Sequence, residues 1–117
     1  MGGDGMTVVY VAAPYTKGDV GTNMHNAIEA AHALIQLGYC PYVPVLNHFV
    51  HIAHPHPYAT WMALDLEMLP RCDVLLRLPG ESPGADKEVA AADAHSIPVV
   101  YSVRELVMYE ENTRVDK

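Results

Sequence analysis

The strongest constraint on the fold of this chain is an alternation of short apolar runs with longer segments of helical periodicity. The first run, residues 7–12, is β-branched and continuously apolar, which is typical of a strand buried on both faces of a parallel sheet. The other predicted strands cover residues 41–45, 73–78 and 97–101. The second of the four is short and flanked by proline, so we expect it at an edge of the sheet.

Helices are predicted between and after these strands, because apolar residues recur there at three- and four-residue spacing. The predicted helices cover residues 22–37, 58–69, 83–95 and 102–111. In the first helix, Thr22 or Asn23 can cap the start, and Gly38 stands where a glycine commonly ends a helix. Strands that alternate with helices indicate a single three-layer α/β domain, flavodoxin- or Rossmann-like, with a mostly parallel sheet of four to five strands.

The composition fits one folded domain and limits the kinds of molecule that it can bind. Half of the 117 residues are hydrophobic and 18% are charged, which is enough apolar surface for a core. The domain is expected to span residues 1–117, with 1–6 as a loose leader and 112–117 as a polar tail. The formal charge of −7 argues against binding of a nucleic-acid backbone, which needs clustered Lys and Arg. A small nucleotide held in a pocket is compatible with that charge.

Cysteine usage and hydropathy indicate the compartment. Cys40 and Cys72 have no CxxC spacing, and two cysteines are too few to stabilise a domain of this size through disulfides. We therefore expect both to be reduced thiols. No apolar stretch reaches the roughly 18 residues of a membrane helix. Residues 1–5 have neither a basic region nor a long apolar region of the kind found in secretory signals. We therefore expect a cytoplasmic protein with no membrane partner.

The fold class predicts where a ligand binds. Ligands of parallel α/β sheets lie beyond the carboxyl ends of the strands, near the point where the strand order reverses. Three loops should converge there: the loop that follows Ala12, the histidine-rich loop 46–57 and the turn 79–84. The phosphate-binding G-x-x-x-x-G-K-[ST], the dinucleotide-binding G-x-G-x-x-G and the G-x-S-x-G nucleophile motif are all missing from the sequence.

The segment 82–88 combines a helix start with polar groups. Ser82 is a suitable N-cap and Pro83 a suitable first helical residue. The backbone N–H groups of Gly84 and Ala85 would then be free to bind an anion or a polar oxygen of a ligand. Gly84 would also let a ligand approach the backbone closely. Ordinary helix capping explains the same residues without a ligand.

Two acidic residues lie early in this helix. Asp86 and Glu88 are two positions apart and therefore point in different directions. Glu88 precedes the apolar segment 89–92, so its carboxyl group lies at the edge of the buried face. A carboxylate in that position is a candidate nucleophile or base.

Asp65 and Tyr10 are further candidates. The helix over 58–69 is expected to bury an apolar face formed by Trp61, Leu64, Met68 and Leu69. Asp65 lies at the border of this face and is either a solvated carboxylate or a partner for a second acid. Two carboxylates from separate helices could divide the nucleophile and acid–base roles. Tyr10, in the first strand, is either a packed ring or a hydrogen-bond donor to a catalytic carboxylate.

Four histidines occupy the loop expected over residues 46–57: His48, His51, His54 and His56. A metal site, and with it a metal-dependent hydrolase, is one interpretation, but no CxxC or HExxH motif accompanies the cluster. A wall of aromatic and imidazole rings against a planar ligand, or plain loop packing, explains the spacing better.

Three motifs occur in a fixed order along the chain. They are Tyr10-Val11-Ala12-Ala13-Pro14-Tyr15, then Asp65-Leu66-Glu67-Met68-Leu69 followed by Cys72-Asp73-Val74-Leu75-Leu76, then Ser82-Pro83-Gly84-Ala85-Asp86-Lys87-Glu88. In this order they resemble the nucleoside 2-deoxyribosyltransferase family, which includes the 2′-deoxynucleoside 5′-phosphate N-hydrolases. The resemblance covers roughly residues 7–101.

The resemblance implies roles for individual residues. Glu88 matches the nucleophile of the family, Asp65 the acid that handles the departing and incoming base, and Tyr10 the tyrosine that orients the glutamate. Substrate contacts are implied for Ala13, Pro14, Tyr15, His48, Trp61, Ser82, Gly84 and Asp86. No metal or organic cofactor is implied. Members are homo-oligomers whose sites a neighbouring subunit completes, and Asn112 could supply such a group.

Two departures from the family bear on the substrate. Ser82 stands where the transferases tend to carry an acid and the phosphate-preferring hydrolases carry a serine. The loop after the first strand offers Lys17 and no arginine. We expect a transferase that exchanges the base of a 2′-deoxyribonucleoside, in nucleoside salvage by analogy. The alternatives are a hydrolase of 2′-deoxynucleoside 5′-monophosphates and a non-catalytic nucleotide-binding module.

Overall fold

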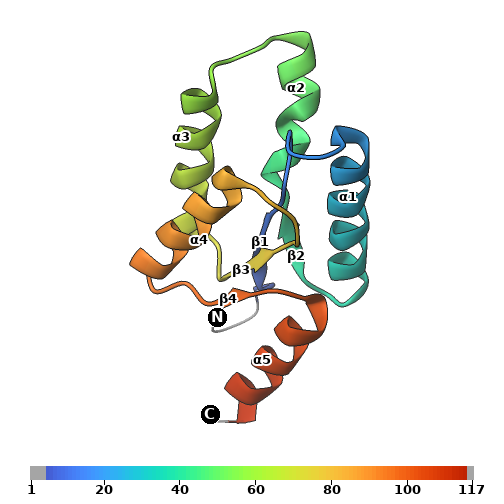
Figure 1. Cartoon of the computed structure of the whole chain (residues 1–117). Coiled ribbons are helices and arrows are strands. Elements are labelled where there is room, and N and C mark those ends of the chain that lie inside the picture. The colour runs from blue at the N-terminus through green and yellow to red at the C-terminus, as the bar shows by residue number, and fades with distance from the viewer. Residues whose placement is uncertain (1–4, 116–117) are drawn as a thin grey trace.

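A parallel sheet forms the centre of the molecule in the computed structural model, which describes residues 5–115 (Figure 1). The strands of this sheet are β1 (Val8–Ala12), β2 (Cys40–Tyr42), β3 (Val74–Arg77) and β4 (Val99–Val100). Their order across the sheet is β2-β1-β3-β4, and each neighbouring pair is parallel. The predicted α/β fold, flavodoxin- or Rossmann-like, is confirmed with four strands, and the short β2 lies at an edge.

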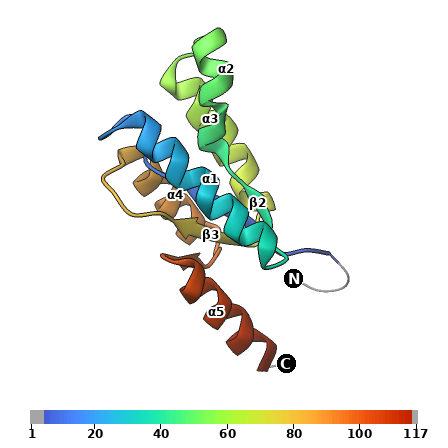
Figure 2. The same ribbon diagram turned by 90° about the vertical axis from the view of Figure 1, so that its right-hand side faces the viewer.

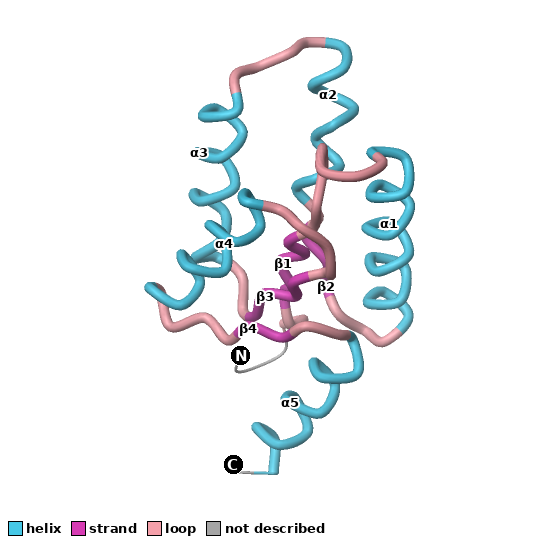
Figure 3. Tube along the Cα trace, viewed as in Figure 1, coloured by secondary structure: helices cyan, strands magenta, loops and turns pink. Residues whose placement is uncertain are grey.

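Helices cover both faces of the sheet (Figures 1 and 3). They are α1 (Val20–Gln36), α2 (His48–Ala53), α3 (Tyr58–Met68), α4 (Pro83–Ala94) and α5 (Val103–Val115), with short 3-10 turns at Pro44–Asn47 and Leu69–Arg71. Helix α1 lies on one face, and α3 and α4 lie on the other. In two views at right angles, α5 lies at the opposite end of the molecule from α2 and the start of α3 (Figures 1 and 2).

The alternation of side chains along β1 divides the core into two parts. Val9 and Val11 pack with Leu34 of α1 and Leu106 of α5 on one face. Tyr10 and Ala12 pack on the other face with a group drawn from β3, α4 and the segments around them: Leu69, Cys72, Leu75, Ala85, Ala92 and Ile97. Because successive strand residues point to opposite faces, Tyr10 is directed toward α4.

Several predicted boundaries are wrong. Residues 48–53 form the helix α2 in place of the expected loop. Helix α1 is capped by Asp19 and not by Thr22 or Asn23, since Asp19 Oδ2 accepts hydrogen bonds from the Thr22 backbone N–H at 2.7 Å and from the Thr22 hydroxyl at 2.8 Å. Helix α5 continues to Val115, so part of the expected tail 112–117 is helical. The expected leader 1–6 lies outside the described residues over positions 1–4, as does the tail over 116–117.

Helix α3 and the residue after it bury only part of the predicted apolar face: Leu69 is buried and Met68 half-buried, but Leu64 is not. Leu64 is 48% exposed, whereas Trp61, Met62 and Asp65 are half-buried on the inner side. The inner side of α3 borders a cavity as well as the core, and a cavity can accept polar and aromatic groups. Apolar spacing alone therefore does not identify the inner face of this helix.

Two contacts fix the loops at the reversal of strand order, between β1 and β3. Asp73 pairs with Val8 in both directions: its backbone N–H donates to Val8 O at 2.9 Å, and its carboxylate accepts from the Val8 N–H at 2.8 Å. At the other end, Gly80 adopts φ +115°, and a Cβ there would lie 2.9 Å from Pro14 Cγ. Only glycine fits both the backbone angle and the space. The loops after β1 and β3 are thus packed together.

Across residues 5–115, the structure has no helix whose length and apolar character would allow it to cross a membrane.

Candidate active site

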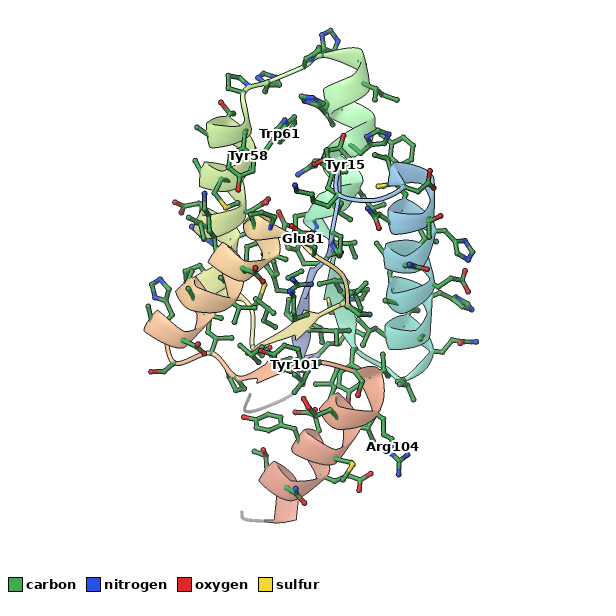
Figure 4. All side chains as sticks on the ribbon, in the orientation of Figure 1. Tyr15, Tyr58, Trp61, Glu81, Tyr101 and Arg104 are labelled. Carbon is green, nitrogen blue, oxygen red and sulfur yellow. The ribbon has the colours of Figure 1, made fainter. Side chains whose placement is uncertain are left out.

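A cavity of about 560 Å³ lies beyond the carboxyl ends of β1 and β3, where the fold class predicts a ligand. Val11 and Ala13 of the β1 segment lie at its base, together with Glu88 of α4 and Asp65 of α3. The side walls come from the 3-10 turn Pro44–Asn47, from α2 and α3, and from the loop after β1. Figure 4 shows Tyr58 and Trp61 on the α3 side and Tyr15 on the side opposite.

The base of the cavity holds a carboxyl pair supported by a tyrosine. Glu88 is only 5% exposed, and Tyr10, fully buried beneath it, donates its hydroxyl hydrogen to Glu88 Oε2 at 2.5 Å. Asp65, on α3, lines the same cavity, and its side chain is close enough to Glu88 for the two carboxyl groups to titrate together. The three candidate catalytic residues are therefore assembled from β1, α3 and α4 at one point.

Burial controls the protonation of this pair. It raises the pKa of Glu88 to about 8, with the charge of Asp65 acting in the same direction, while the Tyr10 hydrogen bond and the charge of Arg77 act against it. Burial also raises the pKa of Asp65, and its hydrogen bond with Glu88 partly offsets that effect. The pKa of Tyr10 is raised by burial and by both carboxyl groups, so its hydroxyl stays a donor.

Burial therefore favours the protonated form of both carboxyl groups, and because the two titrate together, a proton taken up by the pair belongs to both residues. A pair that holds one proton has one carboxylate and one acid. If the proton moves to Asp65, Glu88 becomes a carboxylate that faces the cavity, and Asp65 becomes the acid. Such an arrangement can form a bond to an electrophilic carbon while protonating a leaving group.

Aromatic and imidazole side chains form the upper wall. His51 Nδ1 accepts hydrogen bonds from Trp61 Nε1 at 2.9 Å and from the His56 backbone N–H at 3.2 Å. The rings of His56 and Trp61 meet edge to face with centroids 5.3 Å apart. Tyr15 Oη lies 2.5 Å from His48 Nδ1 across the opening. These contacts tie α2 to α3 and to the loop after β1.

The histidine cluster is divided by the structure. His48, His51 and His56 line the cavity, while His54 is exposed at the end of α2. Among residues 5–115, no group of three or more His, Cys, Asp and Glu side chains is arranged to hold a metal ion. The three cavity histidines contribute rings and nitrogen atoms to the wall.

The start of α4 is capped as predicted and borders the cavity. Ser82 Oγ accepts a hydrogen bond from the Ala85 backbone N–H at 3.1 Å, and Pro83 is the first helical residue. The expectation that the Ala85 N–H is free for a ligand is therefore wrong, because the cap uses it. Gly84 also lines the cavity, and a Cβ there would lie 3.4 Å from Tyr58 Oη. Its lack of a side chain therefore lets α3 come close to the start of α4.

Two predicted substrate contacts lie outside the cavity. Pro14 packs against Gly80 and borders a separate, smaller hollow. The side chain of Asp86 is 71% exposed and pairs with Arg77 at 3.0 Å. The other predicted contacts line the cavity: Ala13, Tyr15, His48, Trp61, Ser82 and Gly84. Asn112 lies on α5, outside the lining of this cavity.

Sequence reasoning missed cavity residues that carry charge or a hydroxyl. Lys87 and Tyr58 both line the cavity, and Lys87 Nζ lies 5.2 Å from the centroid of the Tyr58 ring. Lys17, noted from the sequence in the loop after the first strand, lines the opposite rim. Arg77 was missed as well, although a charged residue at the end of the apolar run 74–76 is a visible signal in the sequence.

Comparisons with known proteins give a family and a fold. A family model described as a domain of unknown function, DUF7768, matches residues 7–102. No curated protein matches the sequence significantly. A solved structure of a 2-deoxyribosyltransferase from the psychrotolerant bacterium Bacillus psychrosaccharolyticus is 19% identical, with a TM-score of 0.61 over 80% of this chain and 69% of that chain. That enzyme is described as a biocatalyst for the synthesis of nucleosides. At this identity the likeness shows a shared fold.

Proposed function

The chain belongs to the DUF7768 family, whose description gives no activity, and from its site we propose that it is a nucleoside 2-deoxyribosyltransferase. The observation that carries the proposal is the buried Glu88 carboxyl group at the base of the cavity, held by Tyr10 and paired with Asp65. The fold shared with a 2-deoxyribosyltransferase and the three ordered motifs support it.

In the first half of the proposed reaction, the Glu88 carboxylate attacks C1′ of a 2′-deoxyribonucleoside. A bond forms between a Glu88 oxygen and C1′ as the bond between C1′ and the base nitrogen breaks. Asp65 takes up the proton of the pair and delivers it to the departing base. Tyr10 keeps the glutamate oriented through its 2.5 Å hydrogen bond. The product of this half is a covalent deoxyribosyl ester and a neutral free base.

In the second half, a different base attacks C1′ of the ester, releases the Glu88 carboxylate and returns a proton to Asp65. Two displacements at one carbon give net retention of configuration. The transition state resembles an oxocarbenium ion, which an electron-withdrawing 2′-hydroxyl would destabilise, so a 2′-deoxy sugar is preferred. The proposed steps use only side chains of the protein and no cofactor.

A second candidate is hydrolysis of 2′-deoxynucleoside 5′-monophosphates, in which water attacks the ester in place of a base. The observation that favours it is a lysine on each side of the cavity, Lys87 on α4 near Ser82 and Lys17 in the loop after β1. Cationic side chains together with backbone N–H groups favour a phosphate.

The proposed partners are small molecules and copies of the same chain. The substrates are a 2′-deoxynucleoside or its 5′-monophosphate and a free base, in the cytoplasm, with neither a nucleic-acid polymer nor a membrane as partner. The exposed apolar side chains of α2 and α3, which include Phe49, Ile52 and Leu64, support assembly into a homodimer or larger homo-oligomer.

Three reaction mixtures analysed by chromatography test the activity. The first holds protein, a 2′-deoxynucleoside and a different free base, the second omits the acceptor base, and the third replaces the nucleoside by its 5′-monophosphate. A new deoxynucleoside that forms only with the acceptor supports the transferase. Free base released without acceptor, and faster from the monophosphate, supports the hydrolase. No reaction across several bases would reject both and favour a nucleotide-binding module.

The variant Glu88→Gln tests the role of the carboxyl group, with Glu81→Gln as the matched control. Glu81 is an exposed residue just before α4, so its substitution makes the same chemical change away from the pair (Figure 4). We expect Glu88→Gln to lose turnover while it still binds ligand, and Glu81→Gln to keep turnover. Unchanged turnover in Glu88→Gln would contradict the mechanism.

A further inference from the structure

Arg77 is a charged residue in an otherwise apolar part of the sheet. It ends β3 at the reversal of strand order, in register with Ala12 of β1. Its side chain is only 11% exposed. One guanidinium nitrogen donates to the carbonyl oxygen of Leu78, and another lies 3.0 Å from Asp86 Oδ1 on the first turn of α4.

The ion pair with Asp86 is too weak to explain why the Arg77 side chain is buried. Removing a guanidinium from water costs several kcal/mol of free energy. An ion pair with a partner as exposed as Asp86 offsets about 1 kcal/mol of that cost or less. An apolar residue would continue the run Val74–Leu76 without that cost. A role in the adjacent site would account for the arginine.

The geometry connects Arg77 to Glu88 through α4. Asp86 and Glu88 lie two residues apart on the same helix and point to different sides. The contact with Asp86 thus holds the first turn of α4 at the end of β3, while Glu88 is presented to the cavity. The positive charge of Arg77 also acts on Glu88 and lowers its pKa, against burial and the charge of Asp65.

We propose that Arg77 is a positioning residue for Glu88, which holds the start of α4 and favours the carboxylate form that attacks substrate. Asp86 is its counter-charge and limits how strongly Arg77 acts on Glu88. The link to attack on substrate rests on the proposed function, whereas the contact of Arg77 with Asp86, at the start of the helix that carries Glu88, stands on the structure alone.

The two partners are expected to have opposite effects on the titration of Glu88. Removing the charge of Arg77 should stabilise the protonated form of Glu88. Removing the charge of Asp86 should leave Arg77 unneutralised and stabilise the carboxylate. A contact with only a mechanical role predicts instead that both substitutions act in the same direction, because both break it. The other groups that face Glu88 are unchanged in either variant: Tyr10 from β1, Tyr42 from β2, Asp65 from α3 and Lys87 beside it on α4.

Carbon-detected NMR of the uniformly ¹³C-labelled full chain measures this titration directly. The Glu88 carboxyl signal is assigned by its loss in Glu88→Gln. We expect its titration midpoint to rise in Arg77→Met and to fall in Asp86→Asn. Arg71→Met is the matched control, since Arg71 forms an exposed ion pair with Glu67 away from the cavity, and it should leave the midpoint unchanged. Shifts in the same direction, or no shift, would overturn the proposal.

If Arg77→Met does not fold, Asp86→Asn decides alone, because Asp86 is exposed and its substitution should be tolerated. In that case a fall in the midpoint supports the proposal and an unchanged midpoint rejects it. A backbone amide spectrum of each variant shows whether the fold is kept.

Kinetics supply the second readout. In Arg77→Met we expect kcat to fall on the order of tenfold, less than the roughly hundredfold cost of a 1 Å misplacement, with KM little changed. The alkaline limb of kcat/KM should move to higher pH, as the NMR midpoint does. Because the NMR titration needs no turnover, failure of the deoxyribosyl reaction leaves the link between Arg77 and Glu88 testable. Turnover with unmoved midpoints would reject only the inference about Arg77.

Discussion

At the scale of single residues, the proton held by Glu88 makes the stability of the protein depend on pH. Burial raises the pKa of Glu88 from an ordinary value of 4.5 to about 8. The unfolded chain therefore releases this proton at lower pH than the folded chain. Between about pH 4.5 and 8 the folded state binds more protons, so the free energy of unfolding falls as pH rises.

Glu88→Gln should remove this dependence, because an amide keeps the shape of the side chain and does not ionise. We expect the melting temperature of the natural sequence to fall more between pH 5 and pH 8 than that of Glu88→Gln, by differential scanning fluorimetry. Glu81→Gln should follow the natural sequence. Parallel curves for all three proteins would show that Glu88 titrates in its ordinary range.

Tyr10 offers a second prediction at this scale. Tyr10→Phe keeps the buried ring and removes the hydroxyl that donates to Glu88 at 2.5 Å. A hydrogen bond to a charged group contributes about 1.5–3 kcal/mol, so kcat should fall about 10- to 100-fold. Because this hydrogen bond lowers the pKa of Glu88, the alkaline limb of the pH profile should also move upward. Steady-state kinetics across pH measure both effects, and a variant as active as the natural sequence would contradict the assigned role.

At the scale of elements, α2 and α3 form a helical hairpin, residues 48–68, whose inner side carries much of the cavity wall. A central contact of this hairpin is His51 Nδ1, which accepts from Trp61 Nε1 across the two helices. His51→Leu should leave the indole N–H without its partner, at a cost of about 1–3 kcal/mol if that group stays buried. We expect a shifted Trp61 emission and a raised KM with kcat less affected.

Fluorescence is a direct readout here, because Trp61 is the one tryptophan in the sequence. His54→Leu is the matched control, since His54 lies on the same hairpin but is exposed and outside the cavity. If both variants shift the emission equally, the hydrogen bond of His51 is not what positions the indole.

How far each element could be predicted depends on what it packs against. The run Val8–Ala12 and helix α1 face the core, so their apolar spacing located them correctly. Helix α2 was missed because none of its residues is buried. Its histidines also interrupt the apolar spacing that would indicate a helix. Leu64 was placed on the wrong side of α3 because the inner side of that helix borders a cavity.

The site follows the same logic. Glu88 and Asp65 could be singled out as candidates because each interrupts or borders an apolar segment, and Tyr10 because it lies on a central strand. The sequence does not show that Pro14 lies outside the cavity. Its contact is with Gly80, which is 66 positions later in the chain (80 minus 14), and only the fold brings the two loops together. The partner of Asp86 is equally invisible in the sequence, because only the fold brings Arg77 beside it.

At the scale of the whole molecule, the shape is elongated, with extents of 45 × 26 × 25 Å. The α2–α3 hairpin lies at one end and α5 at the other (Figure 2). Large apolar side chains on the hairpin face outward, among them Ile52 and Leu64. In the proposed homo-oligomer, a second copy of the chain covers them.

Light scattering after size-exclusion chromatography tests this assembly. We expect the natural sequence to elute with at least twice the mass of one chain and the double variant Ile52→Lys, Leu64→Lys with the mass of one chain. Ile35→Lys is the control, because Ile35 is equally apolar and exposed but lies on α1. A natural sequence that is monomeric at micromolar concentration would reject the proposed assembly.

The separation of Glu88 from most of the aromatic wall has a practical consequence for engineering. Glu88 lies on α4, which packs against the sheet, and Tyr10 lies on β1, whereas His51 and Trp61 lie on the α2–α3 hairpin, which carries Asp65 nearer its end. A library of substitutions restricted to residues 48–61 could therefore sample new ligand preferences while the reactive groups stay in place. For directed evolution, the part of the hairpin that precedes Asp65 can be varied separately from the three candidate catalytic residues.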